Sequence, residues 1–259
     1  MNTHTDFASR HIGPQGEKRR EMLGSLGYET LEELIADIVP ADIRMKAPLD
    51  LPAAKSETEA LEELRSILGK NKILKSFIGQ GYYGTITPSV ILRNVLENPG
   101  WYTAYTPYQP EIAQGRLEML MNFQTMVASL TGLPVANASL LDEGTAAAEA
   151  VSMCRNTRPK ANTFFVADTC HPQTISVIRT RAAWQGVNIV VGDWTSFDPA
   201  SVGADLAGVL VQYPDTLGRI NDYTDFFSRV HAAGALCVVA ADLMALTVIR
   251  EPGSFGADI

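Results

Sequence analysis

Three residues in the second half of the chain have the types and positions to bind an anionic ligand with a flat ring. Thr145 follows Gly144 at the start of an alanine-rich helical segment. The first N–H groups of such a helix can donate to a phosphate, and small side chains leave room for it. His171 and Asp242 each follow a short apolar run. A flat imidazole can stack on a ring, and a carboxylate can keep a ring nitrogen protonated.

Apolar runs alternate with helical segments after residue 160, and this order predicts an α/β fold with a mostly parallel sheet. The segments 174–185 and 223–233 have helical spacing. The strand-like runs are 163–167, 187–192, 208–213 and 235–240. Ligands of such sheets lie beyond the carboxyl ends of the strands, so we expect His171 and Asp242 to lie at that edge.

The start of the alanine-rich helix has two interpretations. Asp142 and Glu143 stand at the same end as Thr145. Two carboxylates would repel a phosphate, while they would themselves be stabilised by the positive end of the helix. The segment therefore predicts either a phosphate cup or a helix capped by its own acidic residues.

A phosphate site at a helix start, a ring residue after one strand and an aspartate after a later strand form the layout of a pyridoxal phosphate site in the aminotransferase-like fold. Such a site also needs a lysine for the Schiff base. All seven lysines precede Asp242; they are Lys18, Lys46, Lys55, Lys70, Lys72, Lys75 and Lys160. Taken singly, His171 and Asp242 are equally well explained as a loop histidine and an acid that caps a strand end.

Two loops rich in aromatic residues precede this part of the chain. Glycines at 79, 81 and 84 surround Tyr82 and Tyr83, and segment 101–111 contains four Trp or Tyr rings and two prolines. Amphipathic rings on loops usually line a pocket or an interface. The alternative is that these rings simply cover a core.

The pattern predicts three parts: a helical N-terminal arm over 1–74, Gly/Tyr-rich loops and a long helix over 75–135, and a partial large domain over 136–259. In the arm, capping boxes at Thr30 and Ser56 predict two helix starts. The long helix, 114–130, carries Met119, Phe123, Met126 and Leu130 on one face, which we expect to join the core.

Composition excludes several classes of partner. The net charge of −8 and the pI of about 5.0 argue against nucleic acid or an anionic membrane, and no run approaches the ~20 apolar residues of a membrane span. Three cysteines without paired spacing suit a reducing compartment and predict no metal site. The first residues resemble no export or import signal, so we expect a cytoplasmic protein.

Several long motifs resemble those of the glycine cleavage system P-protein family. They are RHIG at 10–13, FIGQGYY at 77–83, WYTAYTPYQPE at 101–111, QGRLE at 114–118 and LDEGTAAAE at 141–149. The resemblance runs from end to end of the chain. It corresponds to the amino-terminal half, or first subunit, of that family and implies a truncated piece, because the family's first half continues well beyond residue 259. A partner-dependent chain with an exposed sheet edge is then expected.

The resemblance implies an oxidoreductase of glycine catabolism. The complete enzyme uses pyridoxal phosphate to decarboxylate glycine and passes the aminomethyl group to the lipoyl group of H-protein. The Schiff-base lysine belongs to the second half, so the first half completes the active site and is itself inactive alone. Thr145, His171 and Asp242 are then expected at remnant cofactor positions. The substrate-binding residues expected on the two loops are Tyr82, Tyr83, Tyr105, Tyr108 and Glu111.

Two other functions stay open from the sequence. The chain could be a non-catalytic structural or regulatory relative of the aminotransferase-like fold, or a fragment of another pyridoxal phosphate enzyme whose lysine lies beyond residue 259.

Overall fold

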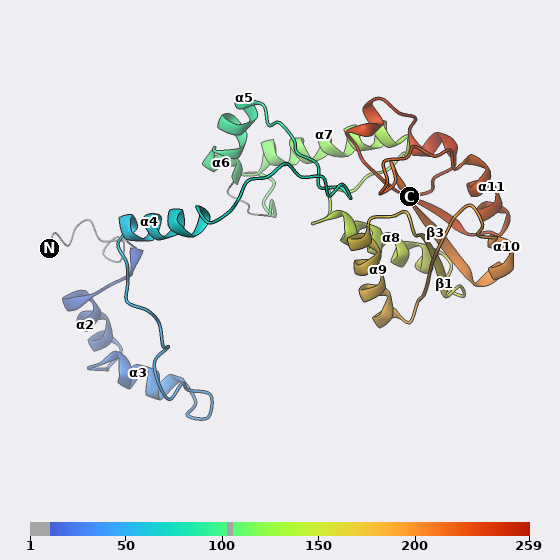
Figure 1. The fold of residues 1–259 in the computed structure, drawn as a ribbon. Helices are drawn as coiled ribbons and strands as arrows, with labels where there is room; N and C mark the ends of the chain where they lie inside the picture. Colours follow the sequence, from blue (N-terminus) through green and yellow to red (C-terminus); the bar gives the residue numbers. More distant parts are fainter. Residues whose placement is uncertain (1–10, 103–105) are drawn as a thin grey trace. The chain divides into compact units, whose positions relative to one another are not determined.

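The computed structural model describes residues 11–102 and 106–259, and the chain divides into two compact units, Met1–Lys75 and Ser76–Ile259 (Figure 1). The sequence-based division at residues 74 and 135 stays a prediction. Tyr105 lies outside the described residues.

The first unit contains the helices α2 (Gly16–Ser25), α3 (Leu31–Ile38) and α4 (Glu57–Leu68). Both predicted capping boxes are confirmed. The Thr30 hydroxyl accepts from the Glu33 amide at 3.2 Å, and the Glu33 carboxylate accepts from the Thr30 amide. Ser56 and Glu59 make the same pair of bonds at α4. Each box satisfies amides that a helix start would otherwise leave free.

Little of the first unit is buried. Among residues 11–75, Leu23 is the one side chain in the buried class, at 6% exposure. The apolar residues of α4 remain about half exposed; they are Leu61, Leu64, Ile67 and Leu68. Within this unit, capping explains where α4 begins, whereas packing contributes little to it.

The second unit contains a parallel sheet with helices on both faces (Figure 1). Its helical elements are α5 (Ser89–Ile91), η1 (Leu92–Leu96), α6 (Pro99–Tyr102), α7 (Gln114–Thr131), α8 (Glu143–Thr157), α9 (Pro172–Gln185), α10 (Pro199–Val202), η2 (Gly203–Asp205), α11 (Thr224–Ala232), η3 (Ala245–Thr247) and η4 (Pro252–Phe255). Its strands are β1 (Thr163–Ala167), β2 (Asn188–Gly192), β3 (Leu206–Tyr213) and β4 (Leu236–Ala241).

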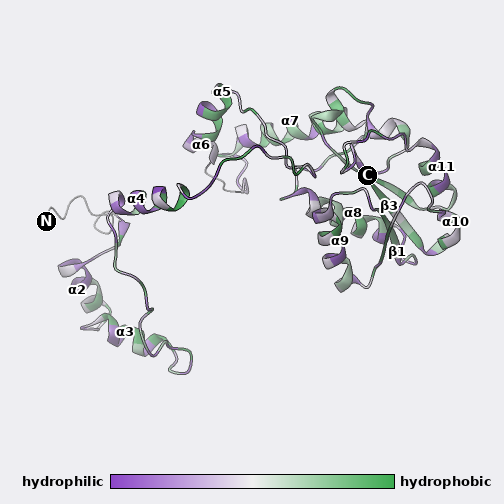
Figure 2. Cartoon of the chain, in the orientation of Figure 1, coloured by the Kyte–Doolittle hydropathy of each residue, from purple (hydrophilic) through white to green (hydrophobic). Residues whose placement is uncertain are grey.

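The four strands pair in the order β2-β1-β3-β4, and every pair is parallel. The predicted α/β fold is confirmed, and each strand lies within two residues of its expected position. β1 and β3 are buried along their whole length because each has a strand on both sides and helices over its faces. Figure 2 shows both strands coloured as hydrophobic, as expected for the centre of a parallel sheet.

A close approach of α8 to β3 holds one face of the sheet. A Cβ atom on Gly208 would lie 2.9 Å from the Leu236 carbonyl oxygen and 3.0 Å from the Cys154 sulfur of α8. On the other face, the Cys237 sulfur lies 3.9 Å from the Phe227 carbonyl oxygen of α11. The absence of a side chain at Gly208 therefore sets how near α8 lies to the sheet.

The three cysteines are free and buried in this core. Burial raises the pKa of the Cys154 and Cys170 thiols to about 12, and it also raises the pKa of Cys237. The thiols are therefore protonated and act as small apolar groups at neutral pH.

The long helix α7 corrects one expectation. Its limits match the prediction, but Met119 and Met126 are 50% and 53% exposed, so the prediction that they join the core is wrong. Leu130, in the last turn, does pack against the core. Helical periodicity places residues on one face of a helix, whereas their burial also requires another element that packs against that face.

No helix in the described part of the chain is both long enough and apolar enough to cross a membrane.

Gly208→Ala tests the close approach of α8. The added Cβ would lie 2.9 Å from the Leu236 oxygen and from Phe164 Cε2. We expect the free energy of unfolding to fall by about 1–3 kcal/mol, measured by urea unfolding followed by circular dichroism. Gly115→Ala in α7, where a Cβ meets nothing within 4 Å, is the control. Gly115→Ala should raise the free energy of unfolding by up to roughly 1 kcal/mol, because alanine has a higher helix propensity than glycine. Equal effects of the two substitutions would contradict the packing account.

Candidate functional site

His171 and Asp242 lie at the same edge of the sheet, as expected from the strand order. His171 follows β1 and Asp242 follows β4, and the end of β3 lies between them. Neighbouring strands are about 4.8 Å apart, so the two strand ends are separated by roughly 10 Å. His171 is 5% exposed, whereas Asp242 is in the exposed class.

The His171 ring is fixed by the turn that follows β3. Its Nδ1 lies 3.1 Å from the Thr216 hydroxyl, and the Thr216 amide donates to the Thr169 carbonyl at 2.8 Å. Asp215, 1% exposed, holds this turn by accepting from the Leu217 amide at 2.9 Å, and it also accepts from the Arg219 amide. The turns after β1 and β3 are therefore joined through the histidine.

A glycine-rich loop packs directly on the other side of this ring. Gly79, Gln80 and Gly81 have φ values of 65°, 56° and 88°. A Cβ on Gly81 would lie 3.3 Å from His171 Nε2 and 3.7 Å from Glu143 Oε1. Glycine at 81 thus serves both the left-handed backbone and the close approach to the imidazole.

The loop is also bonded to the start of α9. The side-chain amide of Gln173 donates to the Gln80 carbonyl at 2.9 Å. Tyr82 and Tyr83 follow immediately and are 61% and 58% exposed. The structure therefore brings this tyrosine pair to the sheet edge that carries His171, with both rings accessible to a ligand or to another chain.

The second aromatic loop lines a different cavity. Tyr108, 76% exposed, lines a cavity of about 670 Å³ together with Trp101 and Arg116. Glu111 is exposed on the same loop, and His171 is not among the lining residues. The expected grouping of Tyr108 and Glu111 with Tyr82 in one pocket stays a prediction, as does the role of Tyr105, which lies outside the described residues.

The start of α8 is capped by its own acid. The Asp142 carboxylate accepts from the Thr145 hydroxyl at 2.6 Å and from the Thr145 amide at 2.9 Å. These two bonds lower the pKa of Asp142. A Cβ on Gly144 would lie 3.2 Å from Val177 of α9, so this glycine permits close packing of two helices. The geometry favours the capped-helix alternative over the phosphate cup.

Pyridoxal phosphate does not fit a complete site within this chain. The anionic Asp142 engages the donors that a phosphate would need at Thr145. The last lysine of the chain is Lys160, before β1. Asp242 Oδ1 accepts from the Met244 amide at 2.9 Å, which is the strand-capping alternative, although its carboxylate remains exposed. A cofactor role for Thr145, His171 or Asp242 stays a prediction.

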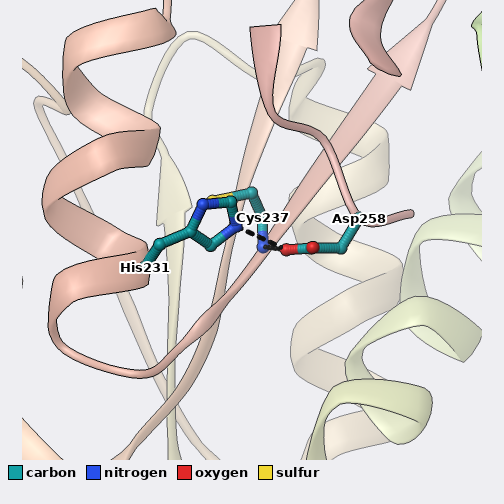
Figure 3. Close-up of side chains that lie close together, drawn as sticks. All are labelled: His231, Cys237 and Asp258. Carbon is teal, nitrogen blue, oxygen red and sulfur yellow. Dashed lines mark hydrogen bonds and ion pairs between the residues drawn. The ribbon is translucent and has the colours of Figure 1, made fainter. Parts of the chain in front are cut away.

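Three possible metal ligands meet near residue 259. His231, Cys237 and Asp258 place their ligand atoms within 4.8 Å of one another (Figure 3). Asp258 Oδ2 already contacts His231 Nε2 at 2.8 Å and accepts from the Cys237 amide at 2.7 Å. Through these two contacts Asp258 joins α11, β4 and the residues after η4. The three residues lie on separate elements, so their spacing in the sequence does not follow the pattern of a metal-binding motif and did not predict that they lie together.

Sequence reasoning missed Gln173 and Thr216 as site residues. Both are polar residues at turns, and their types are ordinary for such positions. Only the pairing of the strands and the path of the glycine loop show that they converge on His171 and Gln80.

Comparisons with known proteins give consistent results. A family model described as glycine cleavage system P-protein matches residues 9–259. A glycine dehydrogenase (decarboxylating) from Akkermansia muciniphila is 93% identical over 259 residues, which are 100% of this chain and 27% of that protein. One from Agrobacterium fabrum is 58% identical over 257 residues, 98% of this chain and 26% of that protein. The chain thus spans about a quarter of the length of these relatives.

A solved structure is also similar. It is a crystal structure of glycine decarboxylase (P-protein) of the glycine cleavage system in inhibitor-bound form, with a TM-score of 0.85 and 36% sequence identity. The match covers 95% of this chain and 56% of that chain.

Asp142→Asn tests the cap of α8, because asparagine keeps an acceptor but removes the charge. The folded pKa of Asp142 is lowered, first by the Thr145 hydroxyl and then by the Thr145 amide. The charge therefore stabilises the fold above the unfolded pKa of about 4, and this contribution is lost as the pH falls through the folded pKa. We expect the parent to melt above the variant near neutral pH, with the gap closing below about pH 4, in thermal unfolding across pH. A gap that widens in acid would contradict this cap.

Proposed function

This chain belongs to the glycine cleavage system P-protein family, and we propose that it is the amino-terminal part of a glycine decarboxylase. In this proposal the complete protein acts on glycine with pyridoxal phosphate and passes the aminomethyl group to the lipoyl group of H-protein. A second half or second subunit supplies the lysine that holds the cofactor, and this chain completes the site. The three buried, free cysteines suit a cytoplasmic protein.

The observation that carries the proposal is the fixed loop with its two exposed tyrosines. Gly81 packs on His171 and Gln80 is bonded to Gln173, so the backbone before Tyr82 is held at the carboxyl edge of the sheet. Ligands of parallel sheets bind at this edge. Phenol groups on a held loop can bond a small zwitterion without charge repulsion.

In this proposal the loop residues of this chain bind and orient glycine, whereas the Schiff-base lysine comes from the second half. Tyr82 and Tyr83 are proposed to hydrogen-bond glycine, and the loop with Tyr105, Tyr108 and Glu111 to complete the wall of the pocket. His171 supports the loop through Gly81. The self-capped start of α8 agrees with a chain that leaves the phosphate to its partner half.

The first test is glycine-dependent release of carbon dioxide by a lysine-bearing second half, measured with labelled glycine with and without this chain. We expect release only when both are present, because neither part carries a complete site. A second half that decarboxylates equally well alone would leave this chain a structural or regulatory role and overturn the proposal.

Tyr82→Phe and Tyr83→Phe test the substrate contacts in the assembled protein. Each removes one hydroxyl and keeps the ring, so we expect kcat/KM for glycine to fall about 10-fold. Tyr28→Phe is the matched control, because its hydroxyl contacts Asp37 within the first unit. It should leave turnover unchanged. Full activity of both loop variants would remove these tyrosines from the site.

A further inference from the structure

We propose that Gln173 is a positioning residue that sets where the Tyr82–Tyr83 pair lies, by holding the backbone of the glycine loop. The inference rests on the proposed function, in which these tyrosines contact glycine. Gln173 lies in the first turn of α9, and its side-chain amide reaches the Gln80 carbonyl, 93 positions earlier in the chain, at 2.9 Å. It acts on substrate through the loop and does not contact it.

The hydrogen bond from Gln173 is made to the residue of the loop whose backbone conformation is the least favourable for its residue type. Gln80 has a φ of 56°, which lies in the left-handed region of backbone conformation. Residues other than glycine seldom adopt this conformation. Such a conformation persists where the surroundings hold it. Gln173 donates a hydrogen bond to the carbonyl of this same residue, and this bond offsets part of the free-energy cost of the left-handed conformation.

The neighbours of Gln80 add a second restraint. Gly79 and Gly81 also have positive φ, and the Tyr82 amide donates to the Gly79 carbonyl at 2.9 Å, which closes the turn. Gly81 packs against His171, which is held by Thr216. The loop is thus held at Gln80 by the hydrogen bond from Gln173 and at Gly81 by packing against the His171 imidazole. Both restraints come immediately before the tyrosine pair.

This arrangement matters because glycines give the loop many alternative conformations. A binding side chain must be held within about 0.5 Å of its productive position, and locked supporting residues provide that precision. Losing the Gln173 bond would leave the Gly81 contact but release the carbonyl of Gln80. The tyrosines would then remain near the site and spend less time in the binding position.

The test uses Gln173→Glu, Gln173→Lys and Gln185→Glu in the assembled protein with its second half. Glutamate keeps the size and suits a helix start, but it lacks the donor. Lysine restores an N–H donor. Gln185 lies at the other end of α9 and bonds Ser152 at 3.0 Å, so its substitution controls for a general effect on the helix.

Hydrogen exchange of the Tyr82 amide should rise roughly 3- to 10-fold in Gln173→Glu, return toward the parent in Gln173→Lys, and stay unchanged in Gln185→Glu. The KM for glycine should rise by a similar factor with kcat nearly constant, because binding geometry is what changes. Unchanged exchange in Gln173→Glu would overturn the inference.

The kinetic outcomes separate this inference from the proposed function. Faster exchange with an unchanged KM, in a protein where Tyr82→Phe does impair turnover, would overturn the positioning role. Faster exchange when Tyr82→Phe has no effect would uphold the loop restraint and overturn the assignment of the tyrosines to glycine.

Discussion

The parallel pairing of β1 with β3 is the constraint on which the candidate site depends. It places the turn with His171 beside the turn with Thr216, and the contact between these side chains exists only in this register. The glycine loop in turn packs on the imidazole. If the two strands were offset, the histidine would lose its support, and the loop would lose the surface that it covers.

The site combines rigid and permissive parts. Helices α8 and α9 are packed so closely that a Cβ on Gly144 would lie 3.2 Å from Val177, which leaves little room for a side chain there. The glycine loop has the opposite character, because its backbone could adopt many conformations and is held from outside. Strands and helices thus supply fixed anchor points, and the loop brings exposed tyrosines to them. This division is common where a scaffold presents binding residues on connecting segments.

Much of the fold could be predicted from local patterns. Apolar runs identified the four strands, and capping boxes identified the starts of α3 and α4, because these signals lie within a few residues. The positions of His171 and Asp242 followed from the rule for strand ends. The exposure of Met119 could not be predicted, because it depends on what packs against α7. The bond from Gln173 to Gln80 joins positions 93 apart, and no local pattern carries that information. At α8, the sequence left two alternatives, and the geometry of Asp142 distinguishes them.

The three cysteines in the core have a practical consequence. Each thiol is buried and protonated. Cys154 lies on α8, Cys170 follows β1 and Cys237 lies on β4, so the three thiols are distributed over both faces of the sheet. Thiol-directed reagents attack the thiolate and need access to the sulfur. Alkylation of this chain is therefore limited by opening of the core. The rate at which the three native cysteines are alkylated therefore measures how often the core opens, and no label has to be introduced.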